Sequence, residues 1–355
     1  MPLYMDIHTV DSETFTVEDV VKAHMQDLAI QERFGVTQIK YWVNVEAKTL
    51  FCLMDGPNKK ACNMVHKESH GNTACNIIEV SDDEFNLFLG EGKSENDLAH
   101  TNHGELDTGY RTILLINAVD LNGKHGNIYR EIHRSIKEHQ GTVIIQPEEE
   151  IMVSFIFSSQ AIDCASGLYK YLKSASDDIE FTLALVSGRP VDEQGENLFE
   201  ESKRKVRCLC ELGLMNTVYI DSATLALYEK ERISQNKIPG TFHVIHSADF
   251  LFLHKLYDIL NARLSDPEFK SEDLYTLLRL SKSQAYRQIK SHIGLAPNQL
   301  IHELRLRNSL KILKNNKQTI SETAFDSGFN SPPYFAKAFK KRFKITPTSF
   351  IKIPN

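Results

Sequence analysis

The stretch Ser281–Arg287 (SKSQAYR) opens a segment whose apolar spacing decides the fold of the last third of the chain. Ser281 is suited to accept a hydrogen bond from the first turn of a helix and so to begin it. Ala285, Ile289 and Ile293 recur at every fourth position, so we expect them to share an inward helix face. The opposite, polar face carries Ser283, Tyr286, Arg287 and Lys290. A polar helix face with an arginine suits the major groove of DNA, because arginine pairs bidentately with guanine.

A second segment further along the chain repeats this pattern. Ile320 and Ala324 lie on a first short helix, and Gly328 permits the tight turn that follows it. The next helix has an inward stripe of phenylalanines, which are Phe335, Phe339 and Phe343. Its outward face carries Pro332, Pro333, Ala336, Lys337 and Lys340. The sequence therefore predicts two helix-turn-helix units in succession.

A helix near residues 298–314, which carries Leu306, Leu310 and Leu313, separates the two units. We expect it to hold the two outward faces about one DNA turn apart, which is about 34 Å. Basic side chains gather at the end of the second outward helix, namely Lys340, Lys341, Arg342 and Lys344. Such side chains neutralise phosphates, which contributes affinity but reads no sequence.

The formal net charge of −6 conceals a strong asymmetry along the chain. From Ala248 onward there are 18 Lys and Arg residues against 9 Asp and Glu residues, which is a net charge of +9. The remainder carries a net charge of −15. A basic end on an acidic body favours a polyanion as the partner of that end.

Residues 250–351 resemble the DNA-binding domain of AraC-type bacterial transcription regulators. The matching positions are Ser281, Tyr286–Arg287, Gly294, Pro297, Arg305–Leu306, Leu313, Ile320, Ala324, Gly328–Phe329, Tyr334–Phe335, Phe339–Lys340, Phe343 and Thr346–Pro347. The resemblance implies that Ser283, Tyr286, Arg287, Pro332, Pro333, Ala336 and Lys337 face base edges. Departures from the family pattern are Tyr275 in place of a small residue, Arg279 and Lys344 in place of glycines, and Ile351 in place of an arginine. A helical bundle that binds protein is the alternative for this part of the chain.

The 355-residue length predicts two or three globular units of ordinary composition. The N-terminal residues MPLYMDIHTVD have no apolar core of a signal peptide, and no stretch approaches the length of a membrane helix. The six cysteines are scattered without a CxxC pair, which favours reduced thiols in a cytoplasmic protein.

The pattern of apolar residues in 1–80 predicts the order β-α-β-β-α-β. Strands are expected at 2–8 and 77–80, helices at 17–33 and 58–69, and a hairpin at 37–54. A linker is expected at 81–109, because Asp, Glu, Gly, Ser and Asn dominate this stretch. A second α/β unit is predicted at 110–231, a connector at 232–249, and helices alone at 250–355. The fold class is thus two ferredoxin-like α+β domains followed by an all-α double helix-turn-helix domain.

The N-terminal unit resembles a small ferredoxin-like family, some of whose members are described as nickel-binding. The matching strings are Met5–His8, Ala23–His24 with Asp27–Leu28, Tyr41–Trp42, Leu50–Leu53 and Val65–Gly71. Asp6 and His8 alternate onto one strand face, and His66 and His70 share one helix face. With His24, these residues are the candidate ligands of Ni²⁺ or another divalent metal, to which Cys52 can add a thiolate. A purely structural role or an organic ligand is the alternative.

The middle unit, residues 110–230, resembles class III nucleotide cyclase homology domains in the order of its elements. The matching outline comprises Arg111–Leu114, a hairpin before Phe155, Phe157–Ser158, Ala161, Cys164–Ala165, Gly188 and a helix at 199–210. The resemblance places the two metal-binding aspartates at Asn117 and Glu149, and the transition-state residues near Arg204 and Cys208. These replacements leave the developing phosphate charge unsupported, so we expect no enzyme activity. Glu148–Glu150 is interpreted as an acidic hairpin tip, with a metal cluster as the alternative.

These patterns predict a sequence-specific transcription regulator whose N-terminal domains receive a signal. The expected partners are double-stranded DNA, a second copy of the chain in a homodimer, and RNA polymerase, with no membrane partner. The alternatives are a nickel-binding protein or a signalling cyclase relative with an appended DNA-binding domain.

Overall fold

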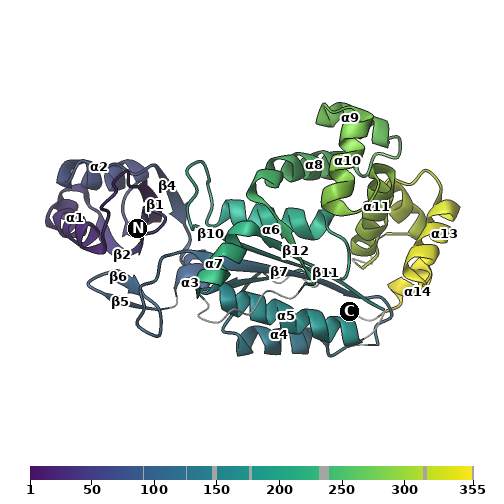
Figure 1. Cartoon of the computed structure of the whole chain (residues 1–355), viewed down its shortest axis with the longest axis horizontal. Helices are drawn as coiled ribbons and strands as arrows, with labels where there is room; N and C mark the ends of the chain where they lie inside the picture. The colour runs from purple at the N-terminus through teal and green to yellow at the C-terminus, as the bar shows by residue number, and fades with distance from the viewer. Residues whose placement is uncertain are drawn as a thin grey trace.

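The computed structural model of the chain describes residues 1–90, 92–124, 126–145, 150–175, 178–231, 240–314 and 318–353. Two six-stranded sheets are followed by a purely helical region (Figure 1). This confirms the predicted mixed α/β body with a helical C-terminal end. Among the described residues, no helix is both long enough and apolar enough to cross a membrane.

The first sheet has the strand order β4-β1-β3-β2-β6-β5. Its strands are β1 (Leu3–Thr9), β2 (Thr37–Asn44), β3 (Thr49–Asp55), β4 (Asn76–Val80), β5 (Lys93–Glu95) and β6 (Leu98–His100). The helices α1 (Val17–Ile30) and α2 (Lys59–Ser69) connect the first four strands, and η1 (Gln31–Phe34) is a short 3-10 turn. The predicted elements of residues 1–80 are therefore confirmed.

Successive side chains of β1 point to opposite faces of this sheet, so they join different clusters. Met5 and Ile7 join an apolar cluster that continues into the middle of the chain. Tyr4 belongs to the apolar cluster that α1 and α2 cover. Asp6 and His8 lie on the same face of the strand as Tyr4. These polar side chains therefore lie beneath α1 and α2.

The stretch predicted as a linker contains regular structure. It holds α3 (Asp82–Leu89) and the strands β5 and β6, of which β6 pairs with β2. The apolar spacing of Phe85, Phe88 and Leu89 explains this correction, because it gives α3 a buried face despite the surrounding acidic residues. The stretch therefore extends the first unit and contributes to the core.

The second sheet has the order β12-β11-β10-β7-β9-β8. Its strands are β7 (Arg111–Asp120), β8 (Thr142–Ile145), β9 (Glu150–Phe155), β10 (Ile179–Gly188), β11 (Thr217–Asp221) and β12 (Phe242–Ile245). One face packs against α4 (Ile128–Glu138), α5 (Ser158–Ala175) and α7 (Ser222–Glu231). The other face is covered by α6 (Glu200–Leu212), as Figure 1 shows.

The predicted connector and the predicted acidic hairpin tip of the middle unit have different outcomes. The end of the predicted connector forms β12, because Phe242 and Ile245 are buried beside the parallel strand β11. Glu148 and Glu149 of the predicted acidic tip lie outside the described residues.

The helical region comprises η2 (Ser247–Asp249), α8 (Phe250–Arg263), α9 (Ser271–Leu278), α10 (Lys282–Ile293), α11 (Pro297–Lys314), α12 (Ile320–Asp326), α13 (Pro332–Phe343) and α14 (Pro347–Ile351). The pairs α9–α10 and α12–α13 form the two predicted helix-turn-helix units. Gly328 has φ +82°, and a Cβ there would lie 2.3 Å from the Leu264 carbonyl oxygen. Arg279 and Lys344, which replace glycines of the AraC-type pattern, also have positive φ angles of 58° and 64°.

The helical region is packed onto the middle unit through both apolar and polar contacts. Leu121, which follows β7, belongs to the apolar core of the second helix-turn-helix unit together with Leu306, Phe335 and Phe339. Arg307 of α11 donates hydrogen bonds to the carbonyl oxygens of residues 210, 211 and 213 at the end of α6. The helical region and the middle unit are therefore in extensive contact.

The junction between the first two units contains a buried ion pair whose loss has a predictable cost. Arg111 donates to both carboxylate oxygens of Asp107 at 2.8 Å and to the Phe88 carbonyl oxygen at 2.8 Å. We predict that Asp107→Ala lowers the free energy of unfolding by about 3–5 kcal/mol, because it leaves a buried guanidinium unpaired. The measurement is the urea midpoint of the full chain, followed by far-UV circular dichroism.

The matched control for this prediction is the exposed pair between Arg33 and Glu68, at 3.3 Å. Glu68→Ala should cost less than about 1 kcal/mol, because water screens the pair. Equal urea midpoints for the two variants would contradict the assigned role of Asp107.

Candidate functional site

The first candidate surface is the outward face of α10. Ser281 begins this helix by accepting a hydrogen bond from the Gln284 N–H at 3.3 Å, and Gln284 bonds back in a capping box. Ala285, Ile289 and Ile293 are buried, as predicted. Ser283, Tyr286, Arg287 and Lys290 are all exposed, with Tyr286 48% exposed although its ring is largely apolar. Lys290 also donates to the Gly294 carbonyl oxygen at 2.5 Å, which ties it to the end of its own helix.

The second candidate surface is the outward face of α13. Ser331 caps the helix, and Pro332 and Pro333 occupy its first two positions. Phe335, Phe339 and Phe343 are buried, whereas Pro333, Lys337, Lys340 and Lys341 are exposed and Pro332 and Ala336 are half-buried. Tyr334 is 56% exposed and lies 3.4 Å from His302 Nε2 through its hydroxyl. The faces of α10 and α13 are thus both open to a partner.

Arg342 differs from the other basic residues of α13. Its guanidinium donates to both carboxylate oxygens of Glu303 on α11 and also to Glu180 on β10. Burial lowers the pKa of Arg342. The hydrogen bonds that Arg342 donates to Glu303 and Glu180 outweigh burial and raise this pKa above its usual value. The interpretation of Arg342 as a phosphate-binding residue is therefore corrected, because its charge is already neutralised by two carboxylates.

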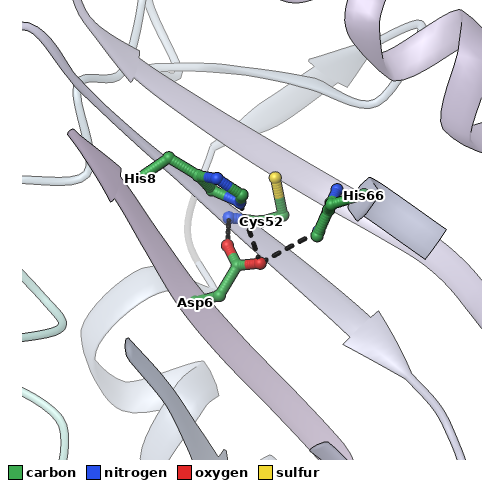
Figure 2. Close-up of side chains that lie close together, drawn as sticks. All are labelled: Asp6, His8, Cys52 and His66. Atoms are coloured by element: carbon green, nitrogen blue, oxygen red, sulfur yellow. Dashed lines mark hydrogen bonds and ion pairs between the residues drawn. The ribbon is translucent and has the colours of Figure 1, made fainter. Parts of the chain in front are cut away.

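The N-terminal unit contains a buried cluster of possible metal ligands (Figure 2). Strand β1 supplies Asp6 and His8, β3 supplies Cys52, and α2 supplies His66. Asp6 Oδ2 lies 3.1 Å from His8 Nε2 and 3.0 Å from His66 Nε2. Asp6 Oδ1 accepts the Cys52 backbone N–H at 2.9 Å. One carboxylate, which is fully buried, therefore holds two imidazoles from different elements.

A second group shares His66 with the first. Asp27 Oδ2 lies 2.9 Å from His66 Nδ1, and Asp27 Oδ1 lies 3.4 Å from His70 Nε2 and contacts the Ser69 hydroxyl. Asp27 was not predicted as a site residue. The available signal was its position on α1, where Val20, His24 and Asp27 recur on the buried helix face. A buried aspartate at such a position requires a partner.

His24 lies apart from both groups. Its Nε2 atom is 3.1 Å from Asp97 Oδ2, and its ring packs against Tyr41 with 4.4 Å between ring centroids. His24 nevertheless lines the same cavity of about 540 Å³ as His8, His66 and His70. The structure thus brings four of the five predicted ligands into two touching groups and places His24 on the wall above them.

The ionisable groups of the cluster are buried and lie close together, and both facts shift their pKa values. Burial raises the pKa of Asp6, but the nearby His8 and His66 outweigh it and hold the pKa of this carboxyl below its usual range. Burial lowers the pKa of His66, whereas its hydrogen bond with Asp27 and the nearby carboxylate of Asp6 raise it to about 10. Burial and the charge of Asp6 raise the pKa of the Cys52 thiol well above its ordinary value. The carboxylates of Asp6 and Asp27 thus favour the protonated form of His66, and burial favours the neutral thiol of Cys52.

The residues that the cyclase resemblance singled out have ordinary structural surroundings. Asn117 lies within β7, between Thr182 and Glu150 of the neighbouring strands. Arg204 pairs with Asp258 of α8 at 2.6 Å, and Cys208 is buried. Glu149 lies outside the described residues. The cyclase resemblance stays a prediction.

Two segments of the chain match known protein families. Residues 274–353 match a family described as a helix-turn-helix domain. Residues 4–80 match the family described as nickel responsive protein SCO4226-like. These two matches lie in the regions of the AraC-type and the nickel-binding-type resemblances.

Individual relatives match parts of the chain. The HTH-type transcriptional regulator MtrA of Neisseria gonorrhoeae is 29% identical over 87 residues, which are 24% of this chain and 29% of that protein. Histidine kinase P4 of Formosa agariphila is 32% identical over 106 residues, which are 30% of this chain and 8% of that protein. The chain therefore spans less than a third of either curated relative.

A solved structure, SCO4226 from Streptomyces coelicolor A3(2), shares 31% sequence identity. The similarity covers 22% of this chain and 94% of that chain, with a TM-score of 0.21. By the two family matches, residues 274–353 are similar to the helix-turn-helix domain family and residues 4–80 to the SCO4226-like family.

Proposed function

We propose that this chain is a sequence-specific DNA-binding transcription regulator of the AraC type. The observation that carries the proposal is the pair of outward helix faces, on α10 and α13, within the family-matched domain. On α10 the reading residues are Ser283, Tyr286, Arg287 and Lys290. On α13 they are Pro332, Pro333, Ala336 and Lys337, while Lys340 and Lys341 contact phosphates.

The body of the regulator consists, in this proposal, of two ferredoxin-like units. The support is a shared strand order, since β4-β1-β3-β2 and β10-β7-β9-β8 arrange four successive strands in the same way. The middle unit is a non-enzymatic relative of nucleotide cyclases that serves as a pairing body. The regulator works as a cytoplasmic homodimer on repeated half-sites and acts on RNA polymerase.

A divalent metal, with nickel as the leading candidate, is the proposed signal of the N-terminal unit. Two features of the cluster fit a metal. The donor atoms of Asp6, His8, Cys52 and His66 lie within 4.8 Å of one another and are of the types that bind divalent metals in proteins. His66 Nε2 is buried without a hydrogen bond, because its 3.0 Å approach to Asp6 has unsuitable geometry. Imidazole, carboxylate and thiolate donors suit Ni²⁺ or Zn²⁺.

Each protein group has a defined part in this proposal. His8 and His66 would offer Nε2 lone pairs, which requires His66 to lose its proton. Asp27 accepts the Nδ1–H of His66 and so orients the ring, as carboxylates that support metal-binding histidines do. A bound metal would supply positive charge that replaces the His66 proton between Asp6 and Asp27.

The DNA-binding proposal is tested by selecting bound DNA from a random pool with the full chain. Arg287→Ala should weaken binding to the selected site by about 5- to 150-fold, because it removes a bidentate base contact. Arg134→Ala on α4, whose side chain is 65% exposed, is the matched control and should leave affinity unchanged. No preference of the full chain for any sequence over scrambled competitor would overturn the regulator proposal.

The different states of Lys340 and Arg342 generate a second prediction. The slope of log K against log salt should fall by about 0.9 in Lys340→Ala, because one phosphate contact is lost. The slope should stay unchanged in Arg342→Ala, because Arg342 is paired with Glu180 and Glu303. Binding isotherms at several salt concentrations measure both, with circular dichroism confirming that each variant is folded. A reduced slope in Arg342→Ala would show that this residue contacts phosphate after all.

The metal proposal is tested by equilibrium dialysis of the full chain against Ni²⁺. Saturable binding should weaken by at least about 10-fold in His66→Gln and in Asp6→Asn. His100→Gln is the control, because His100 lies in the same unit but outside the cluster, with its Nδ1 atom 3.0 Å from the Leu98 carbonyl oxygen. Unchanged nickel binding in a folded His66→Gln variant would assign the cluster a structural role.

A further inference from the structure

The reading faces of α10 and α13 have different chemistry. The exposed face of α10 presents a hydroxyl on Ser283, a phenol on Tyr286 and a guanidinium on Arg287. At the corresponding positions α13 presents Pro333 and Ala336, whose side chains neither donate nor accept hydrogen bonds, and Lys337, whose ammonium only donates. Hydrogen bonding to bases is therefore concentrated on the first unit.

The backbone increases this difference. At the start of a helix the first N–H groups have no partner within the helix and are free for a ligand. In α10 these groups belong to Lys282 and Ser283. In α13 the same two positions are prolines, which have no N–H, and the next N–H, that of Tyr334, is capped by Ser331 at 3.4 Å. The first turn of α13 thus has no free backbone donor.

Two kinds of mark distinguish base pairs in the major groove. One is the pattern of hydrogen-bond donors and acceptors, and the other is the C5-methyl group of thymine, which apolar side chains contact. Ser283, Tyr286 and Arg287 suit the first kind. Pro332, Pro333 and Ala336 suit only the second.

We infer that the two units read different marks, α10 by hydrogen bonds to base edges and α13 by apolar contact with thymine methyl groups. The half-site under α13 is therefore thymine-marked. Lys340 and Lys341 supply the affinity of α13 through phosphates, since their charges favour every sequence equally. In this inference Lys337 joins them at the phosphates and does not read bases. This inference rests on the DNA-binding function proposed above and specifies its substrate.

Base analogues test the inference directly on the selected site. The half-site under α10 is identified as the positions where selection with Arg287→Ala becomes relaxed, and the other half-site is assigned to α13. Uracil in place of thymine removes only the methyl group. Under α13 it should weaken binding of the full chain by about fourfold per contacted methyl, the equivalent of one buried methyl-sized group. Under α10 it should have no effect.

The complementary analogue is 7-deazaguanine, which lacks the N7 acceptor. It should weaken binding under α10 and leave binding unchanged under α13. Pro333→Ser should reduce the uracil effect, whereas Arg134→Ala, which is remote from both faces, should preserve it in full.

The outcomes separate this inference from the function on which it rests. Absence of any sequence preference would overturn the regulator proposal itself. Sequence-specific binding without a uracil effect under α13 would overturn methyl reading alone. A loss of affinity with 7-deazaguanine under α13 would also overturn it, and would assign base reading there to Lys337.

Discussion

The guanidinium of Arg342 fixes the second reading helix in place. It joins α13 to α11 through Glu303 and to the sheet of the middle unit through Glu180. Because these charged groups meet at partly buried positions, removing the guanidinium leaves two carboxylates close together without a cation. The inward side of α13 is therefore occupied by this contact and by the buried Phe335, Phe339 and Phe343. Only the outward side remains for DNA.

Local periodicity explains how much of the fold could be predicted from the sequence. The fourfold spacing of Ala285, Ile289 and Ile293 and the alternation along β1 place side chains correctly without tertiary information. The pairing of Arg342 with Glu180 and of His66 with Asp27 could not be predicted in this way, because these residues meet only after distant segments pack. The predicted linker failed for a related reason, since its acidic composition outweighed the three apolar residues that bury α3.

The N-terminal cluster shows how two periodicities converge on one site. A strand repeat of two places Asp6 beside His8, and a helix repeat places His66 beside His70. Neither pattern indicates which carboxylate lies between the imidazoles. Packing of α1 against α2 supplies Asp27, whose two oxygens face both helical histidines. The candidate ligands were thus predictable as residue types, whereas their grouping depends on the tertiary fold.

Leu121 contributes to a hydrophobic core that does not belong to its own sheet. Gly123, just beyond it, lies so close to Ile353 that a Cβ would be 2.4 Å from that side chain. The reading end is consequently not a freely exchangeable module. A chimera that joins residues 1–249 to the helical domain of a relative would need a cavity in that domain that accepts Leu121. Without such a cavity, the apolar side chain of Leu121 would be exposed to water. Inheritance of the two parts is thereby coupled, and residues around Leu121 and Ile353 are expected to change together in evolution.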